Sequence, residues 1–90
     1  MKRRLNIIGQ GLKQLRIANN LTQTELAAKC GILGWDIERI TITKIENFTR
    51  SVYDAEIILL AKALKIDVSE LVPKQINEKW LISCLNKPRR

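Results

Sequence analysis

The sequence contains no histidine and only two cysteines, and these absences limit the chemistry that it can carry out. Cys30 and Cys84 cannot build a tetrahedral zinc site alone, because such a site needs further nitrogen or sulfur ligands. Gly9-Gln10-Gly11 lies within a helical pattern and follows no strand, so it does not match a phosphate-binding loop. No serine, cysteine and carboxylate set falls in a known catalytic spacing. We therefore expect no enzyme activity, no metal site and no cofactor, and we interpret both cysteines as small buried hydrophobic residues rather than a disulfide.

Long hydrophobic runs are also missing. The longest apolar stretch, Ala55–Leu64, is interrupted by Glu56 and Lys62 and is too short to span a bilayer. The basic start Met1–Arg4 is not followed by the apolar segment of a signal peptide. Aromatic residues make up 4% of the chain, so the basic ends lack the interleaved aromatic side chains typical of single-strand RNA binding. We expect a cytoplasmic protein, encoded by a bacterium or a phage, with no membrane partner.

Positive charge is concentrated at the two ends of the chain, which carries a formal net charge of +7. Six of the 16 basic residues lie in the terminal segments, namely Lys2, Arg3, Arg4, Lys87, Arg89 and Arg90. Ten basic residues and nine acidic ones remain between these segments. The ends are therefore either arms that contact a polyanion or frayed termini that aid solubility.

The stretch 22–47 is interpreted as two helices joined by a turn. Thr22 and Glu25 have the spacing of a capping box, in which each side chain bonds the other residue's backbone N–H. The first helix should end near Gly34, because glycine readily adopts the positive φ found after helices. In the second helix, from about Glu38 to Asn47, Ile42 and Ile45 point inward. The outer side then carries Glu38, Arg39, Ile40, Thr43 and Lys44. This face is either offered to a partner or merely solvated.

Helical patterns cover most of the remaining chain, which predicts an all-α fold. Residues 6–19 form an amphipathic pattern, and Gly9 and Gly11 either weaken its first turn or allow another backbone to approach. A further helix should begin at Tyr53 or Asp54. A short one with a second capping box at 67–70 should end before Pro73. The last pattern, 74–86, places Ile76, Trp80 and Cys84 on one face, which packs either on the body or on a second copy.

Four segments together resemble the Cro/C1-type helix-turn-helix family of phage repressors and their relatives, also called the XRE family. They are Ile8 with Leu12 and Leu15-Arg16, then Leu21–Ala27 (LTQTELA), then Thr41–Asn47 (TITKIEN), and then Leu60–Leu64 (LAKAL) with Val68–Leu71 (VSEL). The resemblance implies a five-helix, lambda-repressor-like bundle over residues 6–72, with the third helix in the major groove of DNA. A basic arm, 1–5, would precede this domain, and a C-terminal helix and basic tail, 73–90, would follow it.

The resemblance also implies roles for single residues. Gln23 would contact the DNA backbone or brace a base-contacting residue. Arg39 and Ile40 would face base edges, and Lys44 would reach a base or a phosphate. Glu38 would accept a hydrogen bond from cytosine or restrict placement by repelling phosphate. With Glu38 and Thr43 added from the outer side of the helix, the predicted DNA-binding set is Gln23, Glu38, Arg39, Ile40, Thr43, Lys44, Asn47, Thr49 and Arg50. The resemblance also implies that Arg16 and Glu46 form a structural ion pair.

The chain departs from the family pattern in two places. The turn before the recognition helix is longer, with about five extra residues in the region 31–36, and Trp35 either fills the added space or anchors a partner. Phe48 stands where relatives usually have glycine, so Asn47 is the candidate for a left-handed conformation there.

The sequence thus predicts a sequence-specific regulator that binds double-stranded DNA. We expect a repressor, acting as a homodimer through the C-terminal helix with Trp80. The alternative is a protein-interaction module of the same fold, such as an antitoxin or an anti-repressor partner, with Trp35 and Phe48 as its contacts.

Overall fold

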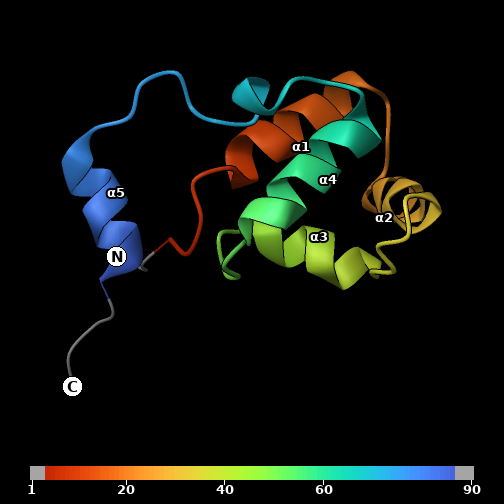
Figure 1. The fold of residues 1–90 in the computed structure, drawn as a ribbon, viewed down its shortest axis with the longest axis horizontal. Helices are drawn as coiled ribbons and strands as arrows, with labels where there is room; N and C mark the ends of the chain where they lie inside the picture. Colours follow the sequence, from red (N-terminus) through yellow and green to blue (C-terminus); the bar gives the residue numbers. More distant parts are fainter. Residues whose placement is uncertain (1–3, 87–90) are drawn as a thin grey trace.

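The computed structural model describes residues 4–86, and within this range the chain is built from helices and turns without any strand. The elements are α1 (Gly9–Ala18), α2 (Gln23–Ile32), α3 (Arg39–Glu46), α4 (Asp54–Leu64), the 3-10 turn η1 (Val68–Glu70) and α5 (Glu78–Leu85). Figure 1 shows α1, α2, α3 and α4 gathered into one bundle, with α5 beside it at the end of an extended segment. The predicted all-α class, with a helix beyond the bundle, is confirmed.

Local hydrogen bonds account for several helix ends. The Glu25 N–H donates to Thr22 Oγ1 at 3.0 Å, and the Thr22 N–H donates to Glu25 Oε1 at 2.8 Å, so the expected capping box is present. The chain leaves α1 through Asn20, whose φ is 58°, and leaves α2 through Gly34, whose φ is 99°. Gly34 takes the positive φ that was expected after this helix, and asparagine is one of the few other residues that tolerate it.

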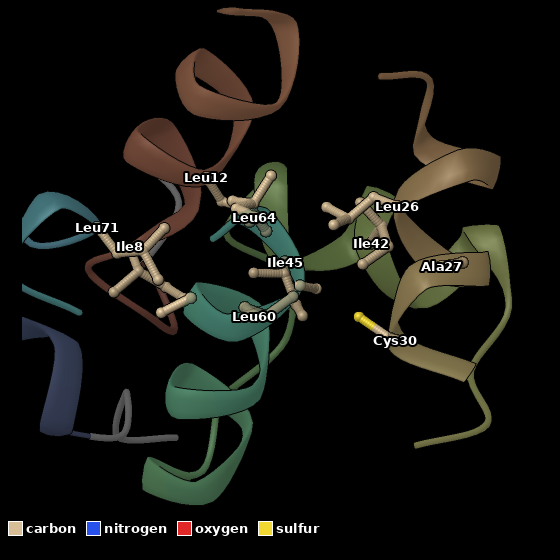
Figure 2. Packing of buried hydrophobic residues seen from close by; sticks show 12 residues of the cluster. Ile8, Leu12, Leu26, Ala27, Cys30, Ile42, Ile45, Leu60, Leu64 and Leu71 are labelled. Carbon is tan, nitrogen blue, oxygen red and sulfur yellow. The ribbon is translucent and has the colours of Figure 1, made fainter. Parts of the chain in front are cut away.

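The core lies where α1, α2, α3 and α4 meet. Figure 2 shows side chains from all four helices pointing toward one another. The largest fully buried side chains are Ile8, Leu12, Leu26, Cys30, Ile42, Ile45, Leu60 and Leu71. Each large aliphatic side chain buried here contributes about 1.5–3 kcal/mol relative to leaving it in water. This core holds the inner face of α3 and leaves its outer face free.

Two glycines in α1 permit close contact between backbones. A Cβ atom on Gly9 would collide with the carbonyl oxygen of Ile45, at the end of α3. A Cβ atom on Gly11 would lie 2.6 Å from the carbonyl oxygen of Leu71. Since real Cβ atoms do not approach oxygen so closely, both positions require glycine. The loss of helix propensity at these sites is therefore offset by packing.

Three local expectations need correction. The pattern over 6–19 becomes helical only at Gly9, because the Asn6 side chain bonds the backbone before that point. The short helix at 67–70 is a 3-10 turn, although its capping bonds from Asp67 and Glu70 are present. The last helix begins at Glu78 and not at residue 74, since the Asn77 side chain accepts a hydrogen bond from the Trp80 N–H.

The helix α5 packs loosely on the bundle. None of its residues is buried, and Ile82 and Leu85 are 53% and 77% exposed. An apolar hollow of about 340 Å³ lies between α5, the N-terminal segment and the beginning of α4. It is lined by Leu5, Asn6, Ile7, Ile8, Val52, Ile57, Leu81, Cys84 and Leu85. Trp80 is half-buried, with the Arg4 guanidinium 5.9 Å from its ring.

The two cysteines have different surroundings. Cys30 is a free thiol that is fully buried in the core, and burial raises its pKa to about 11. Cys84 is half-buried and lines the hollow beside α5. The interpretation of both cysteines as buried residues therefore holds fully for Cys30 and in part for Cys84.

Candidate nucleic-acid interface

The outer face of α3 is the surface that the sequence assigns to DNA. Arg39, Ile40 and Lys44 are exposed there, and Thr43 is half-buried. Ile42 and Ile45, on the opposite side of the helix, are fully buried. Glu38 is exposed and takes an extended conformation just before the helix, without capping it through its side chain. The face is thus mainly polar and basic, and Ile40, which is 47% exposed, adds an apolar contact to it.

Gln23 connects the beginning of α2 to α3. The Thr43 hydroxyl donates to Gln23 Oε1 at 2.7 Å, and Gln23 Nε2 donates to Glu46 Oε1 at 3.0 Å. Arg39 Nη1 in turn lies 3.4 Å from the Thr43 hydroxyl, at the long end of hydrogen-bond distances. Because both ends of the Gln23 amide are bonded to α3, this side chain fixes Thr43 and the helix rather than projecting freely.

A buried ion pair anchors this connection. Arg16 Nε donates to Glu46 Oε2 at 2.7 Å, and Arg16 Nη2 donates to Glu46 Oε1 at 3.1 Å. Arg16 Nη1 also donates to the Leu21 carbonyl at 2.8 Å. The hydrogen bonds to Glu46 raise the pKa of Arg16 above its ordinary value. Removing one partner leaves a charge without compensation in a site where the carboxylate is almost fully buried, a change that typically costs about 3–5 kcal/mol.

The turn after α3 carries the residues assigned to DNA phosphates. Asn47 and Thr49 are exposed, and the Thr49 hydroxyl donates to the Lys44 carbonyl at 3.2 Å. Phe48, and not Asn47, adopts the left-handed conformation, with φ at 62°. Asn47 has a φ of −89°. The phenylalanine is half-buried: its ring lies beneath the Arg4 guanidinium, 4.4 Å from its centroid.

Arg50, also assigned to a phosphate, is engaged with an acidic residue. Its Nη1 and Nη2 each donate to a different oxygen of Glu56 at 2.9 Å. The Glu56 carboxylate also accepts a hydrogen bond from the Tyr53 N–H at 3.0 Å, and this bond caps the beginning of α4. Hydrogen bonds from Arg50 lower the pKa of Glu56, and the same bonds raise the pKa of Arg50. Through its pair with Glu56, Arg50 therefore stabilises the turn between α3 and α4.

Two residues that shape this surface were not identified from the sequence. Glu56 occupies the third position of α4, where a glutamate commonly bonds back to the helix start, so its spacing was a usable signal. Asn6 lies just before α1, where asparagine is a favoured capping residue. Its bonds to Ile45 and Arg50, however, reach across 39 and 44 residues of sequence. No local pattern could have shown them.

The long connection between α2 and α3 spans residues 33–38. Trp35 is half-buried and packs against the core. Its backbone N–H donates to the Cys30 carbonyl at 3.0 Å. Ile37 packs against the core as well. Trp35 therefore fills the space of the longer turn, which was one of the two expected roles.

The basic ends lie mostly outside the described residues. Arg4 is described, whereas Lys2, Arg3, Lys87, Arg89 and Arg90 are not. No helix among residues 4–86 is long and apolar enough to cross a membrane. The same residues hold no cluster of three or more acidic or cysteine side chains placed to bind a metal ion.

Comparison with known proteins agrees with this geometry. The model of the helix-turn-helix family matches residues 12–71, which is well over half of the chain. The chain belongs to the Cro/C1-type, or XRE, helix-turn-helix family of DNA-binding proteins. The expected family is thereby confirmed, and with it the general function of a DNA-binding transcriptional regulator.

Two solved structures are similar to it. The restriction-modification controller protein C.AhdI from Aeromonas hydrophila is 36% identical, with a TM-score of 0.63, over 71% of this chain and 89% of that one. A hypothetical transcription factor, NHTF, from Neisseria shares the fold, with a TM-score of 0.66 and 21% identity over 80% of this chain and 76% of that one. No curated protein matches the sequence.

Proposed function

We propose that this regulator recognises a specific operator by placing the outer face of α3 in the major groove and represses transcription by obstructing polymerase. The observation that carries the proposal is the fixed presentation of that face. Its inner side is buried, its Thr43 is bonded to Gln23, and its last residue, Glu46, is bonded to Arg16. A rigid helix with exposed basic side chains suits the reading of base edges.

The side chains on α3 define which contacts we propose. Arg39 can bridge O6 and N7 of a guanine through two hydrogen bonds, worth about 1–3 kcal/mol of discrimination. Ile40 offers apolar contact to a thymine methyl group. Glu38 can accept from the amino group of cytosine. Lys44 lies four residues, about one turn, after Ile40 and is suited to a base or a phosphate.

The turn after α3 is proposed to bind the phosphate backbone through Asn47 and Thr49, both exposed. Arg50 contributes in a different way from a free arginine. A guanidinium has five N–H groups, and Arg50 uses Nη1 and Nη2 on Glu56 and on the Ser51 carbonyl. Its remaining N–H groups are proposed to reach a phosphate while Glu56 holds the side chain in place.

We also propose a homodimer formed through α5. Ile82 and Leu85 are exposed apolar side chains on a helix that buries none of its residues in the bundle, whereas the half-buried Trp80, two residues before Ile82, lies on a different side of the helix. A twofold dimer would present two recognition helices to half-sites about 34 Å apart along the DNA. The operator is then a palindrome.

The similarity to a restriction-modification controller protein supports a regulatory and non-enzymatic role. It also supports a cytoplasmic location, in a bacterium or encoded by a phage. The alternative role, as a protein-interaction module, took Trp35 and Phe48 as its candidate contacts. Both are half-buried: Trp35 packs on the core and Phe48 lies beneath Arg4, so the DNA-binding role is the better supported one.

The proposal is tested by selecting binding sites from a random duplex library with the full chain, at about 100 mM salt, where weak nonspecific binding is reduced. We expect a palindromic site. Arg39→Ala should then lose its preference at one base pair in each half-site, while Lys13→Ala, an exposed change on α1, should keep every preference.

An unchanged profile for Arg39→Ala would show that the assignment of residues along α3 is wrong. Failure to enrich any sequence would overturn the proposed operator recognition and favour the protein-partner role.

A further inference from the structure

The Asn6 side chain is buried at the junction of α1 and the turn after α3, with 8% of its surface exposed. Its Oδ1 accepts from the N–H groups of Ile8 and Gly9, at 3.1 and 2.8 Å. Its Nδ2 donates to the carbonyls of Ile45 and Arg50, at 3.0 and 2.9 Å. All four hydrogen-bonding positions of the amide are therefore used.

These bonds serve two separate structures. The accepting side bonds the N–H groups of Ile8 and Gly9 where α1 begins, a task that the side-chain oxygens of serine and aspartate can also perform. The donating side joins the last turn of α3 to residue 50, so it bonds the chain on both sides of the turn 47–49. Between these two points the Leu5 N–H donates to the Phe48 carbonyl at 3.0 Å.

Two sets of bonds hold the conformation of this turn. Phe48 has a positive φ, which is unfavourable for a residue with a Cβ atom and a bulky side chain. The end of α3 supports it with two backbone bonds, from the Phe48 N–H to the Ile45 carbonyl at 3.1 Å and from the Thr49 N–H to the Lys44 carbonyl at 2.9 Å. The bonds from Leu5 and Asn6, with the Arg4 guanidinium over the Phe48 ring, add a restraint from the N-terminal segment.

We propose that Asn6 is a positioning residue for DNA binding. It acts through the turn, by holding Asn47 and Thr49 where they meet phosphates, and it touches no DNA itself. The inference rests on the proposed function in one respect, namely that this turn contacts the DNA backbone. It adds that the geometry of those contacts is set from the N-terminal segment.

The variant Asn6→Ser separates the two roles of the side chain. Serine can still cap α1, but it is too short to donate to the carbonyls of Ile45 and Arg50. The matched control is Asn77→Ser, because Asn77 caps α5 by accepting from the Trp80 N–H and belongs to a different part of the chain from the turn. Asn6→Asp, with Asn77→Asp as its control, repeats the test if the serine variant does not fold, since aspartate keeps the acceptors and loses the donors.

The measurement is the affinity for a mixed-sequence duplex at one salt concentration, expressed per folded protein, with the folded fraction taken from circular dichroism. Affinity is the readout, and not its salt dependence, because Asn47 and Thr49 are uncharged and neutralise no phosphate. We expect Asn6→Ser to weaken binding several-fold and Asn77→Ser to leave it unchanged.

The double variant Asn47→Ala/Thr49→Ala distinguishes the two possible failures. If it weakens binding and Asn6→Ser does not, the positioning role of Asn6 is overturned while the phosphate contacts stand. If neither variant weakens binding, the turn does not contact DNA, and both the positioning role and that part of the proposed function are wrong. Adding Asn6→Ser to the double variant should weaken binding no further, and an additive loss would show that Asn6 does not act through Asn47 and Thr49.

Discussion

The exposed face of α3 is connected, residue by residue, to a charge buried in the core. Arg16 bonds Glu46, Glu46 bonds Gln23, and Gln23 bonds Thr43 on the recognition surface. Each donor in this series meets an acceptor, and among residues 4–86 no buried side-chain polar atom lacks a partner. A network with every polar group satisfied restrains the side chains that form it, most strongly at the buried Arg16 and Glu46, because a rotation there leaves a buried polar group without its partner. The ion pair thus contributes to the orientation of α3 more than to net stability.

The Arg50–Glu56 pair makes stability depend on acid pH. The pKa of Glu56 is lowered by its bonds to Arg50, so its stabilising effect is complete above the unfolded value of about 4.5 and is lost as the pH falls through the lower folded value. We expect Glu56→Gln to be less stable than the wild type by about 1–2 kcal/mol at neutral pH, since the pair is partly screened by solvent. At low pH the difference should narrow, because the wild-type carboxylate is then protonated.

Thermal unfolding followed by circular dichroism measures the difference in stability between Glu56→Gln and the wild type at about pH 7 and at about pH 3. Glu78→Gln, an exposed change in the first turn of α5, serves as the control. A destabilisation of Glu56→Gln that is the same at both pH values would show that the ionised carboxylate is not what stabilises the turn.

At the scale of the elements, α3 and α5 differ in how much of each helix is buried in the core. The inner side of α3 is fully buried, and the longer connection before it is anchored by Trp35 and Ile37. By contrast, α5 has a similar length and several apolar residues but buries none of them. An apolar helix left this exposed is typical of an element that meets a partner.

We expect Ile82→Glu to convert a dimer into a monomer. Ile82 is 53% exposed, so the change should leave the fold intact while placing a charge in the proposed interface. Ile32→Glu is the control, because Ile32 is 85% exposed on α2 and lies outside that interface.

Sedimentation of the two variants and the wild type over a range of concentrations measures whether each is a monomer or a dimer. A monomer from Ile32→Glu, or a dimer that persists in Ile82→Glu, would place the interface elsewhere.

For the whole molecule, the distribution of charge bears on how it approaches DNA. The net charge of +7 comes mainly from the two ends. Arg4 stacks over Phe48 and thus belongs to the structure of the turn, so Lys2 and Arg3 are the better test of an electrostatic arm. We expect Lys2→Gln/Arg3→Gln to weaken binding to all duplexes alike and to lower the salt slope by up to about 1.8.

The same two-charge change on the body, Lys13→Gln/Lys62→Gln, is the control for net charge, since both lysines are exposed on helices other than α3 and the proposed dimer helix α5. Equal slopes for the two double variants would show that only total charge matters. If the slope of the arm variant equals that of the wild type, residues 2 and 3 do not contact DNA.

The sequence by itself determined the all-α class, the family and most helix boundaries. These depend on interactions within a few residues, such as the capping box of Thr22 and Glu25, or on helical spacing of apolar residues, which is visible in the order of residues. The outward face of α3 followed from the same periodicity. The roles given there to single residues remain predictions, which the binding experiments above test one by one.

Only the tertiary structure decided which groups meet across long stretches of chain. It showed that Arg50 is engaged by Glu56, that Phe48 rather than Asn47 takes the strained conformation, and that Asn6 bonds the turn after α3. It also showed that α5 buries no residue. The physical reason is that hydrogen bonds and burial depend on distances between groups in space, and packing brings together residues whose separation along the chain carries no periodic signal.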